Sequence, residues 1–215
     1  TENKYIRLFI FKYFKIKAVI SLPQLAFSPY TNTKTSILLA QKKTKDEIEV
    51  WDKLWAEKSK EYSNLKTRVE NIIKVHNGKG NKSRLKTIKD LSEEQERELI
   101  KRMLKNYYVV KDNKLSKDEL IEKYEQELKE LCKHDKATVN LFGHVNTWWV
   151  FGEVAKEISY DIFMAEAEEV GYKRTKRTER PRPNDLFRTD DQGNILVDDG
   201  IQETILDYMR DIIWE

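Results

Sequence analysis

The chain has 215 residues, of which 40 are Lys or Arg and 37 are Asp or Glu, so its formal charge at pH 7 is only +3. No apolar run approaches the ~18 residues of a membrane span, and the single cysteine, Cys132, cannot form an internal disulfide. These features exclude an integral membrane protein and predict a soluble protein in a reducing cytoplasm. Because the first residue is Thr1 rather than Met, we expect a processed or excised piece.

Charge is distributed unevenly along the chain. Residues 1–43 carry eight basic and one acidic residue, whereas residues 137–215 carry nine basic and sixteen acidic residues. The near-neutral total therefore hides a dipolar chain, which we divide into three segments: residues 1–43, 44–135 and 136–215.

The first segment predicts a helix and two strands. Residues 4–14 have a helical pattern, and residues 16–21 form a β-rich run. This run ends at Leu22-Pro23, because proline cannot donate to a ladder. After a loop, residues 35–40 form a second β-rich run, and we expect the two strands to be neighbours in one sheet.

The second segment has the heptad spacing of a coiled coil. Large apolar residues recur at alternating steps of three and four, with Lys58 as the only polar residue on the seam. They are Ile48, Trp51, Trp55, Tyr62, Leu65, Val69 and Ile72. Because residues 121–131 repeat this spacing, we expect a helical hairpin or small bundle, joined by a flexible basic loop around residues 74–90.

The third segment is mixed. An aromatic patch covers residues 142–151, and residues 162–165 are compatible with either a strand or a helix. The turn residues 191–194 predict a β-hairpin. A final helix is expected to carry Ile201, Ile205, Tyr208 and Ile212 on one face. The fold class is therefore α+β, dominated by helix.

One basic strip crosses the acidic third of the chain. Residues 172–182 hold six basic residues and one acidic residue. The basic residues are Lys173, Arg174, Lys176, Arg177, Arg180 and Arg182. The strip suits phosphate contacts of nucleic acid, but it is equally compatible with a solvated loop that neutralises its acidic surroundings. Cys132 and His134 supply only two of the four ligands of a structural zinc site, so no metal is predicted. The sequence identifies no catalytic triad.

Residues 18–39, AVISLPQLAFSPYTNTKTSILL, resemble a characteristic segment of N6-adenine DNA methyltransferases. The closest likeness is to the modification (M) subunit of type I restriction-modification systems, and residues 162–172 and 183–186 extend it more weakly. The resemblance implies a C-terminal remnant of a Rossmann-like methyltransferase sheet, carrying a long helical hairpin insertion. It also implies methyl transfer from S-adenosylmethionine to adenine N6 in a specific DNA sequence.

The resemblance further implies roles for residues of the loop between the two strands. Phe27 occupies the position that stacks on the flipped target base, with Tyr30 as the alternative; an ordinary loop anchor is the plainer interpretation of Phe27. Lys34 and Thr35 would contact the DNA backbone.

Two departures from the family limit what this chain is expected to do. The glycine-rich turn that binds S-adenosylmethionine and the Asn-Pro-Pro-Tyr-type motif do not occur in these residues. We therefore expect an inactive C-terminal fragment with no catalytic or cofactor-binding residue. The expected partners are DNA and the specificity and restriction subunits, for which the seam of residues 48–72 and the final helix are the expected docking faces. A second copy of the chain is expected to associate through an open sheet edge. No membrane contact is expected. The rival hypothesis is a non-catalytic helical scaffold or nucleic-acid-binding module.

Overall fold

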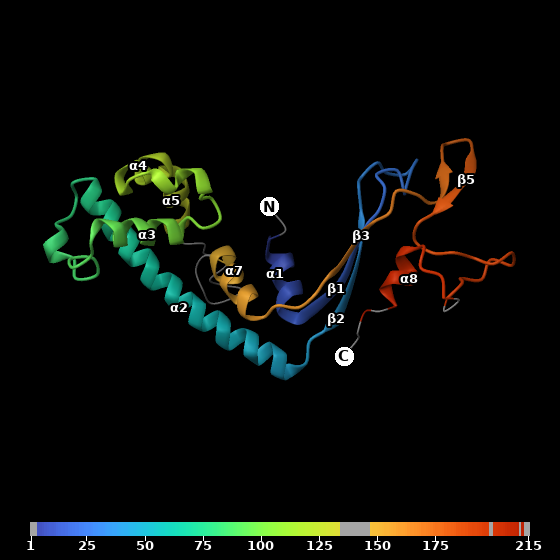
Figure 1. Ribbon diagram of the computed structural model, residues 1–215, viewed down its shortest axis with the longest axis horizontal. Helices are drawn as coiled ribbons and strands as arrows, with labels where there is room; N and C mark the ends of the chain where they lie inside the picture. The colour runs from blue at the N-terminus through green and yellow to red at the C-terminus, as the bar shows by residue number, and fades with distance from the viewer. Residues whose placement is uncertain (1–3, 134–146, 198–199, 211, 213–215) are drawn as a thin grey trace. The chain divides into compact units, whose positions relative to one another are not determined.

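The computed structural model describes residues 4–133, 147–197, 200–210 and 212 (Figure 1). Its contacts divide the chain into two units: residues 1–48 with 160–215, here called the sheet unit, and residues 49–159, the helical unit. The expected segment 136–215 contributes to both, since α7 (Thr147–Glu157) belongs to the helical unit and the strands after it to the sheet unit. The fold is α+β and dominated by helix.

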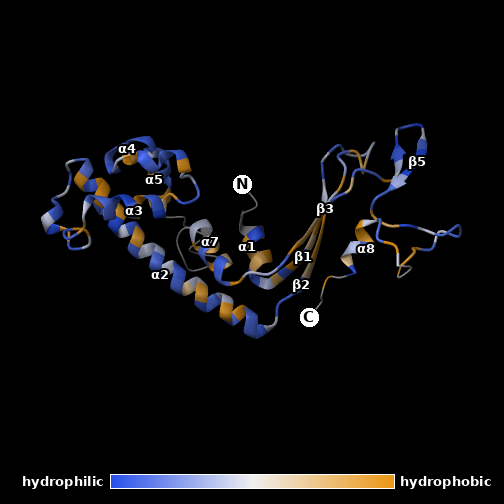
Figure 2. Ribbon diagram, in the orientation of Figure 1, coloured by the Kyte–Doolittle hydropathy of each residue, from blue (hydrophilic) through white to orange (hydrophobic). Residues whose placement is uncertain are grey.

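The sheet unit contains the predicted strand pair. Its elements are α1 (Lys4–Tyr13), β1 (Phe14–Ser21), β2 (Ser36–Lys42) and β3 (Phe163–Glu166). The strand order is β2-β1-β3, with β1 antiparallel to β2 and parallel to β3. Residues 163–165, which the sequence left open between strand and helix, are therefore strand. Figure 2 shows how hydrophobic β1 is, and its alternate residues Ile16, Ala18 and Ile20 are buried.

A small core lies beside this sheet. It contains Ile20, Leu22, Ala26, Ala167 and Ile205, so it joins β1, the loop after β1, the residue after β3 and the C-terminal helix. Burial of apolar surface in this core stabilises the fold by about 25 cal/mol for each Å² removed from water. This core holds the start of the β1–β2 loop in place.

The basic strip forms a β-hairpin that the sequence did not predict. Strands β4 (Val170–Arg174) and β5 (Glu179–Asn184) pair antiparallel. Thr175 closes the turn, because its backbone N–H donates to the Thr178 carbonyl at 2.8 Å. The Thr and Pro content of the strip gives no hairpin pattern of alternating apolar residues, so the sequence does not indicate this pairing.

The predicted turn at residues 191–194 is confirmed, but its flanks form only one bridge, between Thr189 and Ile195. Gly193 adopts φ +86°, which favours glycine in the turn.

The C-terminal helix α8 (Ile205–Met209) is shorter than expected. The carboxylate of Asp207 accepts hydrogen bonds from the backbone N–H and the hydroxyl of Thr204, at 2.9 and 2.7 Å, and this cap begins the helix at Ile205. Ile201 therefore lies before the helix, and Ile212 lies after it.

The helical unit contains most of a long helix, α2 (Lys45–His76), with several short elements. These are a 3-10 turn at Lys82–Arg84, α3 (Glu93–Met103), a 3-10 turn at Val110–Lys114, α4 (Lys117–Lys123), α5 (Glu125–Cys132) and α7. Hydrophobic residues recur along α2 (Figure 2). Its buried residues match the predicted seam with two exceptions: Ile48 is only half-buried, and Ser59 rather than Lys58 is the buried polar residue.

Elements of the same chain cover the seam. The Tyr62 hydroxyl donates to the Leu131 carbonyl of α5 at 2.6 Å, and the Tyr62 ring lies 5.3 Å from the Trp149 ring of α7. Trp51 likewise lies 6.2 Å from Phe151. The expectation that the seam is a docking face for another subunit is therefore wrong, because the seam is occupied by the chain's own helices. None of the described helices has the length and hydrophobicity of a membrane span.

Candidate nucleic-acid interface

The loop at residues 22–35, between β1 and β2, presents two aromatic side chains; we call it the aromatic loop. Its base is closed by the Leu22 N–H, which donates to the Thr35 carbonyl at 3.0 Å, and Ala26 anchors it in the core. Phe27 is 46% exposed and Tyr30 is 80% exposed. Leu22 and Ala26 thus perform the anchoring role, and Phe27 is not among the residues of this core.

The structure brings this loop and the β4–β5 hairpin together, although 130 or more residues separate them (Figure 1). The Tyr172 hydroxyl donates to the Ala26 carbonyl at 2.9 Å. The Arg174 guanidinium lies 5.8 Å from the centroid of the Tyr30 ring, within cation–π range. The two sequence-predicted groups of site residues therefore share one surface of the sheet unit.

Most cations of the hairpin have no counter-charge in the described part of the chain. Arg174 lies 3.3 Å from Glu179, and Arg182 lies 3.9 Å from Glu169. The remaining four make no ion pair with any described residue; they are Lys173, Lys176, Arg177 and Arg180. Unpaired, exposed cations on one hairpin favour an anionic partner.

Neither Lys34 nor Thr35 is free to contact the DNA backbone, which is the role expected from the sequence. The Lys34 ammonium is 2.6 Å from the Glu166 carboxylate, and both side chains are more than half exposed. This hydrogen bond lowers the pKa of Glu166. The Thr35 hydroxyl oxygen is buried, so it does not reach the surface that the other residues share.

A cleft of about 370 Å³ separates the aromatic loop from the hairpin. The loop contributes residues 23–26 to its lining, and the hairpin contributes Tyr172, Lys173 and Arg182. Glu168, Glu169 and Val170 complete the lining. The Asp185 carboxylate fixes the backbone of the two glutamates by accepting from both N–H groups, at 2.8 and 2.9 Å. Sequence reasoning missed these two carboxylates, whose only signal was an acidic pair just before the basic strip.

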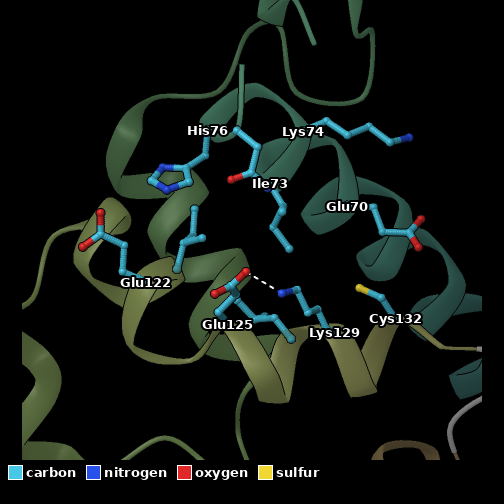
Figure 3. A pocket seen from close by; sticks show the side chains of 11 residues that line it. Glu70, Ile73, Lys74, His76, Glu122, Glu125, Lys129 and Cys132 are labelled. Atoms are coloured by element: carbon cyan, nitrogen blue, oxygen red, sulfur yellow. Dashed lines mark hydrogen bonds and ion pairs between the residues drawn. The ribbon is translucent and has the colours of Figure 1, made fainter. Parts of the chain in front are cut away.

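The helical unit has a second pocket, of about 420 Å³, between α2, α4 and α5 (Figure 3). Its apolar lining includes Ile73, and its charged groups are partly paired: Glu125 with Lys129, and His76 with Asp118 at 2.8 Å. Burial raises the pKa of the Cys132 thiol to about 11, so this thiol is protonated and a poor nucleophile. Within the described ranges, no three His, Cys, Asp or Glu side chains are grouped as metal ligands.

The basic loop after α2 is bound into the fold. The Lys82 ammonium lies 2.5 Å from the buried Glu96 carboxylate and donates to the Leu91 carbonyl at 2.6 Å. Asn81 caps the following turn by accepting from the Ser83 N–H at 3.0 Å. The Lys82 cation of this loop therefore has a carboxylate partner within the fold.

The residues of the sheet unit do not fit S-adenosylmethionine. A glycine-rich turn lets the backbone approach such a cofactor closely after a strand. The loop after β1 has no glycine from Leu22 to Thr35, and β3 is followed directly by Ala167-Glu168-Glu169. Neither turn therefore allows the close backbone approach that this cofactor needs.

In the comparison with known proteins, no family model matches the chain and no curated protein is detectably similar to it. The likeness to adenine methyltransferases thus rests on the residue pattern of the aromatic loop and its flanking strands.

Proposed function

We propose that this chain is the C-terminal part of a site-specific adenine-N6 DNA methyltransferase subunit, of the type I modification kind, and that its sheet unit binds DNA. The observation that carries the proposal is the apposition of the exposed aromatic loop and the unpaired cations of the β4–β5 hairpin, joined by the Tyr172–Ala26 hydrogen bond. Aromatic rings beside basic side chains are the combination that binds unstacked bases and phosphates.

Phe27 is the better stacking residue of the two aromatic candidates. The ring of Tyr30 lies against the Arg174 guanidinium, whereas Phe27 makes no aromatic or cation contact with any described residue. The hairpin cations contact phosphates and hold the strand while the ring of Phe27 stacks on the extruded adenine.

The parent reaction needs more than this chain supplies. S-adenosylmethionine, when bound to the parent enzyme, provides the methyl group, and no residue of this chain is proposed to hold it. The specificity and restriction subunits are the proposed protein partners, and this chain alone is proposed to be inactive. The exposed apolar residues Ile37 and Leu38 of β2 suit self-association along the sheet edge.

DNA binding by the full chain tests the central claim. Fluorescence anisotropy with a labelled duplex, repeated over a range of salt concentrations, should give an affinity that falls as salt rises. The double variant Lys176→Gln/Arg177→Gln should bind more weakly and lower the slope of log K against log salt by about 0.7–0.9 for each lost phosphate contact.

The control is Lys129→Gln, which removes an exposed cation that is ion-paired in the helical unit. It should leave both the affinity and the slope unchanged. Equal weakening by the control and the hairpin variant, or binding that is independent of salt, contradicts the proposed DNA surface.

Stacking is tested in the subunit that contains this chain. With 2-aminopurine at the target adenine, binding should raise the fluorescence as the base leaves the stack. Phe27→Ala should reduce this rise and the rate of methyl transfer, and Phe27→Trp should restore both. A subunit that transfers no methyl group to adenine favours the rival, a nucleic-acid-binding module without catalysis.

A further inference from the structure

The cleft between the aromatic loop and the hairpin has the size and lining of a ligand site. Its volume of about 370 Å³ lies in the ~300–1,000 Å³ range of small-molecule sites. Pro23, Leu25 and Ala26 give it an apolar side, and Leu25 is 53% exposed although it is a large hydrophobic residue. An exposed apolar side chain at a cleft suits a flat, weakly hydrated ligand such as a nucleobase.

The polar groups of the cleft are of two kinds. Glu168 and Glu169 supply carboxylates, which accept hydrogen bonds only. Lys173 and Arg182 supply cations; Arg182 lies 3.9 Å from Glu169, and Lys173 has no acidic partner among the described residues. A nucleotide presents the matching pair of features, a phosphate for the cations and, on some bases, an exocyclic amino group for the carboxylates.

The surroundings of the carboxylates are fixed before any ligand arrives. Their backbone N–H groups are both held by Asp185, and the preceding Ala167 is buried and donates to the Ser21 carbonyl at 2.9 Å. On the other side, the Tyr172–Ala26 hydrogen bond sets the distance between loop and hairpin. Preorganisation of this kind lowers the entropic cost of binding.

From this geometry we infer that the cleft binds one unpaired nucleotide of the DNA strand and selects a base with an exocyclic amino group over thymine. The inference rests on the proposed DNA-binding function. The base must be unpaired, because a paired base cannot enter a cleft without leaving the duplex stack. The amino hydrogens of cytosine N4 donate to Glu168 or Glu169, whereas an unpaired thymine has only its N3–H to donate, between O4 and O2 acceptors that meet carboxylate oxygen unfavourably.

The test compares two single-stranded probes with the same backbone charge. Oligodeoxycytidine and oligothymidine of about 12 nucleotides are titrated into the full chain, and the ratio of the two Kd values is measured. We expect cytosine to bind about ten-fold more tightly than thymine. The variant Glu168→Gln/Glu169→Gln should bring the ratio to about one, because a glutamine amide also donates to thymine O4.

The matched control is Glu179→Gln, which removes an acidic residue of the same hairpin that does not line the cleft. It should tighten binding of both probes equally and keep the ratio. A wild-type ratio near one, or a ratio that the two cleft substitutions leave unchanged, overturns the inference about the cleft. If both probes still bind in a salt-dependent manner, the proposed DNA surface is upheld. If the chain binds neither of the two probes nor the duplex, both the cleft inference and the proposed DNA-binding function are overturned.

Discussion

Two regions of the chain use charge in opposite ways. In the helical unit, the buried Glu96 carboxylate has two ammonium partners, Lys82 at 2.5 Å and Lys117 at 3.3 Å. In the sheet unit, Lys176 and Arg177 extend from a hairpin with no acidic partner among the described residues. The contrast indicates that charge stabilises the fold around Glu96 and is available to a partner at the β4–β5 hairpin.

Aromatic residues show the same division. Trp149 is 1% exposed in the helical unit, and Tyr62 beside it is fully buried. Phe27 and Tyr30 are large and exposed in the sheet unit. Composition alone does not separate core aromatic residues from binding aromatic residues, because both kinds lie next to cations. The exposed fraction of each side chain does separate them.

The largest expected loss of stability comes from a substitution in the core of the helical unit. Trp149→Ala removes a buried ring that contacts Tyr62, receives the Lys105 ammonium at 4.4 Å from its centroid and donates from Nε1 to the Arg102 carbonyl at 3.1 Å. Loss of such a ring costs about 3–5 kcal/mol. Urea unfolding followed by circular dichroism should show this loss.

Trp148→Ala is the control for this change. Trp148 is the neighbouring tryptophan, only half-buried, with an edge contact to Phe151 at 5.9 Å. It should cost clearly less than Trp149→Ala. Equal losses for the two variants contradict the burial pattern of α7.

A smaller effect concerns acid stability of the helical unit. Burial alone would raise the pKa of Glu153, but hydrogen bonds from Lys105 at 2.7 Å and Lys156 at 2.8 Å hold that pKa at about 2. Because this value lies below the ordinary 4.5, the stabilisation is complete above about pH 4.5 and is lost as the pH falls toward 2. Glu153→Gln should therefore cost on the order of 2 kcal/mol at pH 7 and much less near pH 2.5.

Denaturant unfolding of wild type and variant over this pH range measures the difference. Glu122→Gln, an exposed glutamate of α4 without an ion pair to any described residue, should change stability by less than about 0.5 kcal/mol at every pH. A Glu153→Gln penalty that does not shrink at low pH rules out the ion pairs as its cause.

Local patterns predicted the elements of this fold better than their pairing. The heptad spacing on α2 identified six of its seven buried residues, because helical periodicity is a local property. The β4–β5 hairpin escaped prediction because its strands are mostly exposed and have no alternating apolar residues. Pairing of β3 with β1 depends on segments more than 140 residues apart, which no local window contains.

The candidate site shows the same limit. Phe27, Tyr30 and the hairpin cations were chosen from the sequence as two unrelated groups, and their apposition through Tyr172 is tertiary. The burial of the Thr35 hydroxyl and the contact of Lys34 with Glu166 were equally out of reach, since each depends on residues distant in the chain or on loop packing.

The smallest expected effect on DNA binding concerns Lys34 of the aromatic loop, which is already ion-paired. Glu166 holds Lys34 at 2.6 Å, so DNA phosphate must displace a carboxylate before Lys34 contacts it. Exposed pairs of this type are weak, so Glu166→Gln should tighten DNA binding by less than about five-fold. Glu157→Gln, which removes a carboxylate 3.2 Å from Lys58 in the helical unit, controls for net charge.

A double-variant cycle separates release of Lys34 from a general charge effect. In a Lys34→Gln background, Glu166→Gln should tighten binding no more than Glu157→Gln does, because no ammonium remains to be released. Anisotropy titrations of all four members of the cycle at one salt concentration measure this coupling. If Glu166→Gln acts equally in both backgrounds, Lys34 makes no phosphate contact, and the DNA surface is confined to the hairpin and the aromatic rings.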